Sequence, residues 1–156
     1  MLKIEIPGFK KFEIEHLVFD YNGTLAIDGK LIEGVKPLLE LLSKQFTIHI
    51  LTADTFGTSE QELSNVNCKL TILPPKEQDI QKMLYVTKLG SESVISIGNG
   101  RNDALMMRES ALSIMLIQQE GAYGNLTEVS DIICLSVIDA MNLLLNPKRL
   151  IATLRK

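Results

Sequence analysis

The stretch His16-Leu17-Val18-Phe19-Asp20-Tyr21-Asn22-Gly23-Thr24 runs an apolar segment into an aspartate and then into a tight polar turn. Far downstream, the apolar run Val94-Ile95-Ser96-Ile97 ends in Gly98-Asn99-Gly100-Arg101-Asn102-Asp103. Parallel strands bring the residues that follow them to one edge of a sheet, where α/β enzymes bind their ligands. The two stretches therefore predict a cluster of polar side chains at one sheet edge.

The rest of the chain alternates apolar runs with segments of helical periodicity. We expect strands over residues 3–6, 12–19, 46–51, 69–73, 94–97, 112–117 and 132–135, and helices over 35–44, 58–65, 77–89, 102–109, from the capping residue Ser136 to Leu145, and from Pro147. In the helix over 77–89, the apolar side chains of Ile80, Leu84 and Leu89 are expected to face inward. The alternation predicts an α/β fold with three Rossmann-like layers, a central parallel sheet and an N-terminal β-hairpin that turns around Pro7-Gly8.

The composition is that of an ordinary globular protein. With 156 residues, of which 46% are hydrophobic, we expect a single domain over 1–156 with a sizeable core. A net charge of -3 argues against a nucleic-acid partner, and no apolar run approaches the roughly 20 residues of a membrane span. Cys68 and Cys134 match no metal-ligand spacing, so we interpret them as buried thiols of a cytoplasmic protein.

Taken in this order, the two strand-end segments resemble motifs I and IV of the haloacid dehalogenase superfamily of phosphoryl-transfer enzymes. Within it, the chain is most similar to the phosphorylation domain of P-type ATPases and their soluble relatives, because Asn102-Asp103 matches the end of the Gly-Asp-Gly-X-Asn-Asp motif of the pumps. The likeness continues through Ala104-Leu105, Ser110-Ala111 and Ser130-Asp131-Ile132-Ile133. It implies a Mg²⁺-dependent phosphohydrolase that acts through an aspartyl phosphate.

The resemblance implies a role for each residue that matches a motif. Asp20 would be the nucleophile, which divides a difficult hydrolysis into formation and breakdown of an acyl phosphate. Gly23 lets the backbone turn sharply, so that amides around Gly23 and Thr24 can point at phosphate oxygens. Thr52, which ends the second core strand, would hydrogen-bond the transferred phosphoryl group.

Two lysines compete for the third motif of the family, which supplies a positive charge to the phosphoryl group. We expect Lys82 to be this lysine, because it fits by its spacing to Gly98. Lys76, which follows two prolines as in the Pro-X-X-Lys pattern of the pumps, is the alternative. Asn102 would also contact the substrate phosphate.

Two positions depart from the family pattern. Ordinary phosphatases of the superfamily have an aspartate two residues after the nucleophile as general acid and base, and here this position is Asn22, whose amide cannot transfer a proton. Asn99 likewise replaces an aspartate that binds magnesium. The implied Mg²⁺ ligands are therefore Asp20, the backbone carbonyl of Asn22, the Asn99 amide and Asp103, which predicts weak metal binding and slow turnover.

The segments between the motifs are too short for a cap domain. We therefore expect an open site that acts on a phosphorylated substrate of unspecified identity, or one that takes its lid from a second copy of the chain. Beside the nucleophile, Tyr21 could stack on such a substrate, while His16 and His49 are expected to be structural. The alternative function is a catalytically weak or inactive domain that binds phosphate and Mg²⁺ and acts through a protein partner, because Asn22 removes the general acid.

Overall fold

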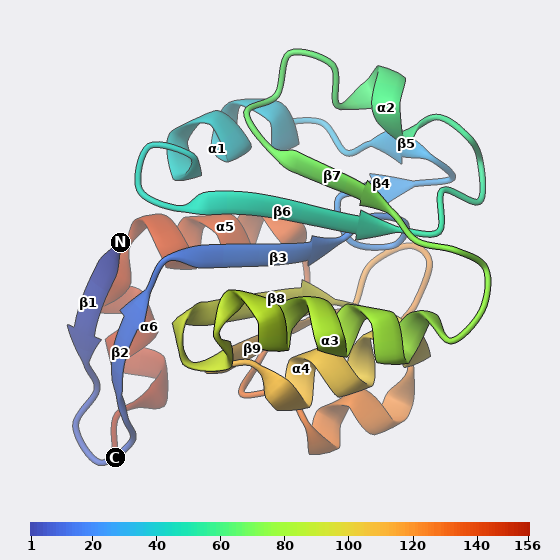
Figure 1. Ribbon diagram of the computed structural model, residues 1–156. Helices are drawn as coiled ribbons and strands as arrows, with labels where there is room; N and C mark the ends of the chain where they lie inside the picture. The colour runs from blue at the N-terminus through green and yellow to red at the C-terminus, as the bar shows by residue number, and fades with distance from the viewer.

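The computed structural model describes residues 1–156 and is built around a six-stranded sheet (Figure 1). Its strands lie in the order β10-β9-β8-β3-β6-β7, and every neighbouring pair is parallel. The bounds are β3 (His16–Asp20), β6 (Thr47–Thr52), β7 (Lys69–Ile72), β8 (Val94–Gly98), β9 (Leu112–Leu116) and β10 (Ile132–Cys134). The central position of β3 places Asp20 in the middle of the sheet edge.

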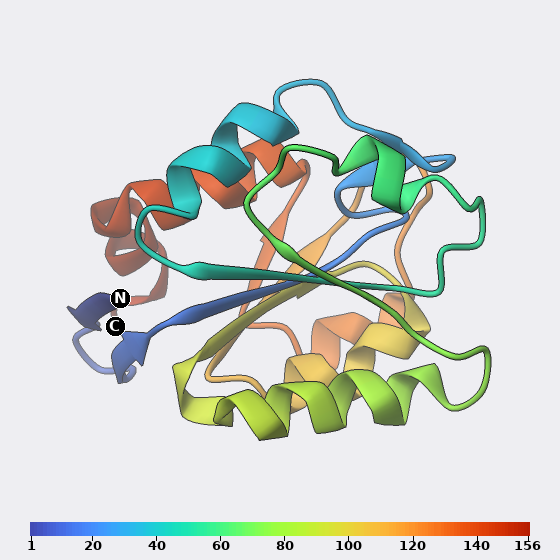
Figure 2. The ribbon, with the colours of Figure 1, turned by 45° about the horizontal axis from the view of Figure 1, so that its top comes forward.

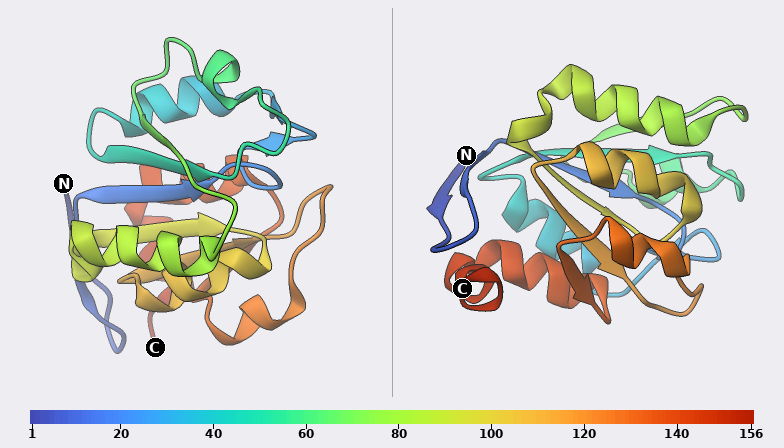
Figure 3. Two further views of the ribbon diagram at one scale, coloured as in Figure 1. Left: turned by 45° about the vertical axis from the view of Figure 1, so that its right-hand side comes forward. Right: turned by 90° about the horizontal axis from the view of Figure 1, so that it is seen from below.

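Helices cover both faces of this sheet, which confirms the three-layer α/β prediction (Figures 1 and 2). One face carries α1 (Val35–Leu42), α2 (Ser59–Glu62), α5 (Val137–Leu145) and α6 (Pro147–Leu154), and the other carries α3 (Gln78–Leu89) and α4 (Ala104–Glu109). Short 3-10 turns are η1 (Ser91–Ser93), η2 (Arg101–Asp103) and η3 (Gly124–Glu128). Figure 3 shows the two helical layers from the side and from below. No helix combines the length and the apolar character that crossing a bilayer requires.

The N-terminal hairpin forms as predicted, from the antiparallel strands β1 (Leu2–Glu5) and β2 (Lys11–Ile14). However, the expected single strand over 12–19 is wrong. The chain divides at Glu15 into β2 and β3, which belong to different sheets. The backbone of Glu15 bonds to Ser93 at 3.0 Å and to Thr47 at 2.9 Å, so this residue leaves the hairpin and enters the core sheet.

A second hairpin was not predicted. It joins β4 (Ala26–Ile27) to β5 (Lys30–Leu31) through Asp28-Gly29. Both turn residues have positive φ, 51° and 79°, which is the geometry that favours an Asp-Gly pair in a two-residue β-turn. Apart from this hairpin, the segment between β3 and β6 holds only α1, so no cap domain is inserted there.

The inward face of α3 differs from the predicted one. Ile80 and Leu84 are 39% and 56% exposed, whereas Lys82 and Val86 are buried. Only Leu89 of the predicted set packs against the core, together with Tyr85. The helix is rotated so that an ionic side chain, and not an apolar one, points at the edge of the sheet.

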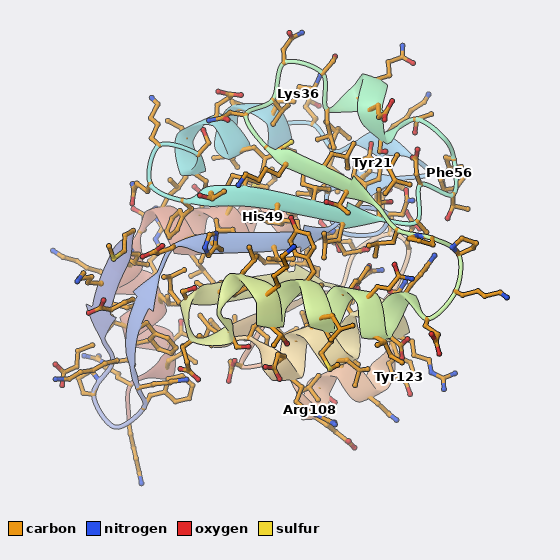
Figure 4. The ribbon with its side chains drawn as sticks, in the orientation of Figure 1. Tyr21, Lys36, His49, Phe56, Arg108 and Tyr123 are labelled. Atoms are coloured by element: carbon orange, nitrogen blue, oxygen red, sulfur yellow. The ribbon has the colours of Figure 1, made fainter.

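The two histidines have structural surroundings. His16 Nδ1 lies 3.1 Å from His49 Nε2, and His49 Nδ1 lies 2.9 Å from the Tyr85 hydroxyl. Burial, with the nearby His16 and Lys69, lowers the pKa of His49 to about 4, so the ring is neutral near pH 7. Figure 4 shows His49 on the sheet beside α3. Both cysteines are free, but only Cys134 is buried and Cys68 is half-buried.

Candidate active site

Polar side chains from four parts of the chain meet at the carboxyl edge of the central strands. Asp20 ends β3, Thr52 ends the neighbouring β6, and Asn99 follows β8 on the other side. Asp103 lies in η2 and Lys82 in α3. All five side chains are buried, so their polar groups must be satisfied by one another or by a ligand.

Lys82 joins the two carboxylates of the site. Its Nζ donates to Asp20 Oδ1 at 2.6 Å and to Asp103 Oδ1 at 2.7 Å, and its side chain is 1% exposed. Burial alone would lower its pKa, but the charges of Asp103 and Asp20 raise the pKa of Lys82 above its ordinary value. Lys76 is exposed in the loop before α3, so Lys82 is the lysine that reaches the carboxylates.

Asp20 holds its proton more tightly than an ordinary aspartate. Burial and the neighbouring charge of Asp103 raise the pKa of Asp20 to about 6, against the opposing effect of Lys82. A strongly shifted carboxyl group between a like charge and a buried lysine is typical of functional sites.

The turn after β3 folds over this carboxylate. The Thr24 hydroxyl lies 3.3 Å from both Asp20 Oδ2 and Asn99 Oδ1. Gly23 has a φ of 82°, and a Cβ at this position would collide with the Asn99 side chain. Glycine is therefore required twice over at Gly23, by its backbone conformation and by the close approach of the two motifs.

The segment after β8 is held by Asp103. Asp103 Oδ2 accepts hydrogen bonds from the backbone amides of Asn99 at 3.1 Å and Gly100 at 2.8 Å. A Cβ at Gly98 would lie 2.5 Å from the same oxygen, so glycine is needed there as well. The Asn99 amide group donates to the Gly121 carbonyl at 3.0 Å, which leaves Asn99 Oδ1 facing Thr24.

The remaining predicted site residues lie at the same edge without touching Asp20. Thr52 Oγ1 accepts from the Asp54 amide at 2.8 Å. Asn102 Oδ1 lies 3.5 Å from Lys82 Nζ, at the margin of hydrogen-bond distance. Asn22 Oδ1 is buried and has no hydrogen-bond partner. The expectation that Tyr21 stacks on a substrate is wrong, because its ring is fully buried and its hydroxyl donates to the Gly29 carbonyl at 3.0 Å.

The oxygen donors of the site fit a hard divalent cation. Two carboxylates, the Asn99 amide oxygen and the backbone carbonyl of Asn22 are the ligand types that Mg²⁺ takes, with water and substrate phosphate completing its shell. No group of three His, Cys, Asp or Glu side chains gathers anywhere in the fold.

Gln118 supports the turn after β3 and was not identified from the sequence. Its Nε2 donates to the carbonyls of Gly23 and Thr24, both at 3.0 Å, and its Oε1 accepts from the Val137 amide at 2.8 Å. The side chain therefore ties this turn to the first residue of α5. A lone glutamine two residues after a strand carries no local signal that could have revealed this role.

We expect Gln118→Ala to loosen the turn around Gly23 and Thr24. Three hydrogen bonds are lost, each contributing about 1 kcal/mol, so the amides of this turn should exchange with solvent at least about tenfold faster. Hydrogen–deuterium exchange measures this directly. Gln119→Ala is the matched control, because Gln119 is exposed and makes none of these bonds. Equal exchange in both variants would show that Gln118 does not hold the turn.

Comparison with known proteins gives one family relationship and a consistent fold. No protein-family model matches the chain. It is 39% identical over 82 residues to the uncharacterized protein MJ0073 of Methanocaldococcus jannaschii, covering 50% of this chain and 88% of that protein. A second protein of the same organism, MJ0072, is 51% identical over 39 residues, which are 25% of this chain and 89% of that protein.

Three of the similar solved structures are phosphatases. The 3-deoxy-D-manno-octulosonate 8-phosphate phosphatase of Moraxella catarrhalis, in complex with magnesium, phosphate and KDO, aligns with a TM-score of 0.63 and 20% identity, over 90% of this chain and 92% of that one. The cobalt-bound phosphatase YrbI of Haemophilus influenzae aligns with a TM-score of 0.66 and 14% identity, over 87% of this chain and 90% of that one. A phospho-aspartyl intermediate analogue of phosphoserine phosphatase aligns with a TM-score of 0.62 and 13% identity, over 83% of this chain and 98% of that one.

None of these three structures is a P-type ATPase, so the narrower resemblance to the pumps stays a prediction. The six-stranded parallel sheet and its flanking helices do match all three. The chain thus has the fold of the haloacid dehalogenase superfamily, and it belongs to the same family as MJ0073 of Methanocaldococcus jannaschii.

Proposed function

We propose that this protein is a Mg²⁺-dependent phosphohydrolase of the soluble P-type-ATPase-like group, acting as one domain through an aspartyl phosphate on Asp20. The observation that carries the proposal is the buried contact of Lys82 with Asp20 and Asp103 at the strand ends. The phosphatase fold of the similar structures supports the reaction class.

The chemistry follows from the placement of the charges. A carboxylate oxygen of Asp20 attacks phosphorus, the bond from phosphorus to the ester oxygen breaks, and the leaving group takes up a proton from solvent, because Asn22 cannot supply one. Water then attacks the acyl phosphate, which releases inorganic phosphate and restores the Asp20 carboxylate. Lys82 offsets the negative charge of the phosphoryl group. The amides of Gly23 and Thr24, which were expected to point at phosphate oxygens, instead donate to the carbonyls of Ala26 at 2.7 Å and Tyr21 at 3.1 Å.

Mg²⁺ would be held by Asp20, Asp103, the Asn99 amide oxygen and the Asn22 carbonyl. When bound, it neutralises charge on the phosphoryl oxygens. The chain itself supplies the nucleophile, the lysine and the positioning of the turn. A second copy covering the open edge belongs to the same proposal, because no cap domain is inserted between the motifs.

The second candidate is a phosphate-binding domain with little or no turnover, which acts through a protein partner. Asn22 favours it, because its side-chain oxygen is buried without a partner and cannot transfer a proton. The two candidates differ in whether a phosphorylated Asp20 forms and breaks down.

The deciding experiment incubates purified protein with a panel of phosphate esters and acyl phosphates, with Mg²⁺ or with EDTA. We expect slow, Mg²⁺-dependent phosphate release, with a phosphoryl group found by mass spectrometry on the peptide that contains Asp20. Binding of beryllofluoride without turnover of any panel compound would favour the second candidate. Turnover that is equal in EDTA would contradict the metal dependence.

A further inference from the structure

A polar pocket of about 340 Å³ lies beside the catalytic carboxylates, between the start of α3 and the turn η2. It is lined by Pro75, Glu77, Gln78, Asp79, Arg101 and Asn102. The larger cavity of about 640 Å³ is different in character, because Leu31 and Leu135 are among its apolar lining residues and it meets the turn after β3 through Gln118. The polar pocket adjoins Lys82 instead, through its lining residue Asn102.

Asn102 connects the pocket to the phosphoryl site. Its Oδ1 lies 3.5 Å from Lys82 Nζ, and its Nδ2 donates to Gln78 Oε1 at 3.3 Å. The same side chain thus lies 3.5 Å from the Nζ of Lys82 on one side and lines the pocket on the other. A phosphate ester whose phosphoryl group contacts Lys82 has room for its leaving group in this pocket.

The pocket contains opposite charges that do not neutralise each other. Arg101, Glu77 and Asp79 take part in none of the five ion pairs of the fold, and their side chains make no hydrogen bond within the protein. The Arg101 guanidinium lies 6.0 Å above the ring of Tyr123, whose amide donates to the Asn99 carbonyl. The ring attracts the guanidinium without using its N–H donors, which stay free for a ligand.

We propose that this pocket binds a leaving group that carries both a carboxylate and an ammonium, so that the substrate is an O-phosphorylated amino acid. Arg101 would bind the carboxylate through two parallel hydrogen bonds, while Asp79 and Glu77 would bind the ammonium. Two acidic groups against one basic group repel a leaving group that is only anionic. The lining contains no large apolar side chain, so it disfavours an apolar leaving group. This assignment rests on the phosphohydrolase function proposed above and narrows its substrate.

The test compares four phosphate esters that differ in charge. O-phospho-L-serine carries both groups, phosphoethanolamine only the ammonium, phosphoglycolate only the carboxylate, and glycerol 1-phosphate neither. We expect the highest kcat/KM for O-phospho-L-serine. A charged hydrogen bond contributes about 1.5–3 kcal/mol, so Arg101→Gln should lower the preference for O-phospho-L-serine over phosphoethanolamine by about 10- to 100-fold, mainly through KM. Asp79→Asn should similarly lower the preference for O-phospho-L-serine over phosphoglycolate.

Arg108→Gln is the matched control, because Arg108 is an exposed arginine on α4 that does not line the pocket (Figure 4). It should keep the wild-type ratios among the four esters. Thermal unfolding of all three variants establishes that they are folded.

The outcomes separate this inference from the proposed function. Mg²⁺-dependent turnover with phosphorylated Asp20, but with equal kcat/KM for the four esters or with ratios that Arg101→Gln leaves in place, would overturn the pocket assignment alone. Absence of turnover for every ester would overturn the phosphohydrolase. In that case, calorimetric titration with O-phospho-L-serine and glycerol 1-phosphate tests the pocket assignment. Weaker binding of O-phospho-L-serine to Arg101→Gln than to the wild type supports the assignment, and equal affinities of the two proteins for it contradict the assignment.

Discussion

The Asp20→Asn variant is expected to lose all measurable turnover of phosphate esters while keeping its fold. An amide is not a nucleophile toward phosphorus at neutral pH, so no acyl phosphate can form. Asn has nearly the same shape as Asp and can still accept a hydrogen bond from Lys82. Release of phosphate from p-nitrophenyl phosphate measures the loss, and circular dichroism establishes the fold. Mass spectrometry must show that residue 20 has not reverted to aspartate.

The same variant should also change how the stability of the metal-free protein depends on pH. The pKa of Asp20 is about 6 in the folded state, above the 3.8 of an ordinary aspartate, so the folded state binds more protons between these values. The contribution of Asp20 to stability is therefore present below pH about 4 and is lost as the pH rises toward 6. In EDTA, we expect the thermal midpoint of Asp20→Asn to exceed that of the wild type at pH 7 and to approach it near pH 4.

Asp28→Asn is the control for both measurements. Asp28 lies in the exposed turn between β4 and β5 with a φ of 51°, a conformation that asparagine adopts as readily as aspartate. It should retain wild-type turnover and the wild-type pH dependence. Full activity in Asp20→Asn would remove Asp20 from the mechanism and with it the aspartyl phosphate.

The main sheet could be predicted from the sequence because its four inner strands, β9, β8, β3 and β6, are buried on both faces. Such strands read as nearly continuous apolar runs, and the runs ending at Asp20 and at Gly98 are of this kind. The break at Glu15 could not be predicted, because a change from one sheet to another leaves the pattern of side chains almost unaltered. The hairpin at Asp28-Gly29 did carry a signal, a two-residue Asp-Gly turn, although its strands of two residues are too short to show alternation.

The error in α3 has a different physical origin. Helical periodicity assigns apolar side chains to the inner face, and by that rule Lys82 points outward. Its partners Asp20 and Asp103 are 62 and 21 residues away, so the ionic contacts that make its burial favourable lie outside any local window. Spacing relative to Gly98 identified the lysine where periodicity failed. Neither periodicity nor spacing indicated a role for Gln118, because its partners are two carbonyls and an amide of the backbone.

The second large effect is expected from Asn22→Asp. The Asn22 side-chain oxygen is buried near the nucleophile without a hydrogen-bond partner, so a carboxyl group fits there without displacing an existing contact. That carboxyl group could activate the water that hydrolyses the acyl phosphate, and such general base assistance contributes about 10²–10⁴-fold to a rate. We therefore expect the variant to break down a trapped aspartyl phosphate faster than the wild type and to turn over p-nitrophenyl phosphate faster.

The gain should fall short of that full range for two reasons. A third carboxylate beside Asp20 and Asp103 repels the incoming phosphate, and Asn99 leaves the metal site with less charge than an aspartate would. Single-turnover phosphate release at saturating Mg²⁺ isolates the hydrolytic step from both effects.

Asn146→Asp is the control for this variant, because it adds the same charge at the exposed start of α6 and should change neither rate. Asn22 precedes a glycine and is prone to deamidation, so its mass in the wild type must be verified. A wild-type phosphoenzyme that already breaks down as fast as the variant's would mean that another group activates the water, and that Asn22 does not limit the reaction.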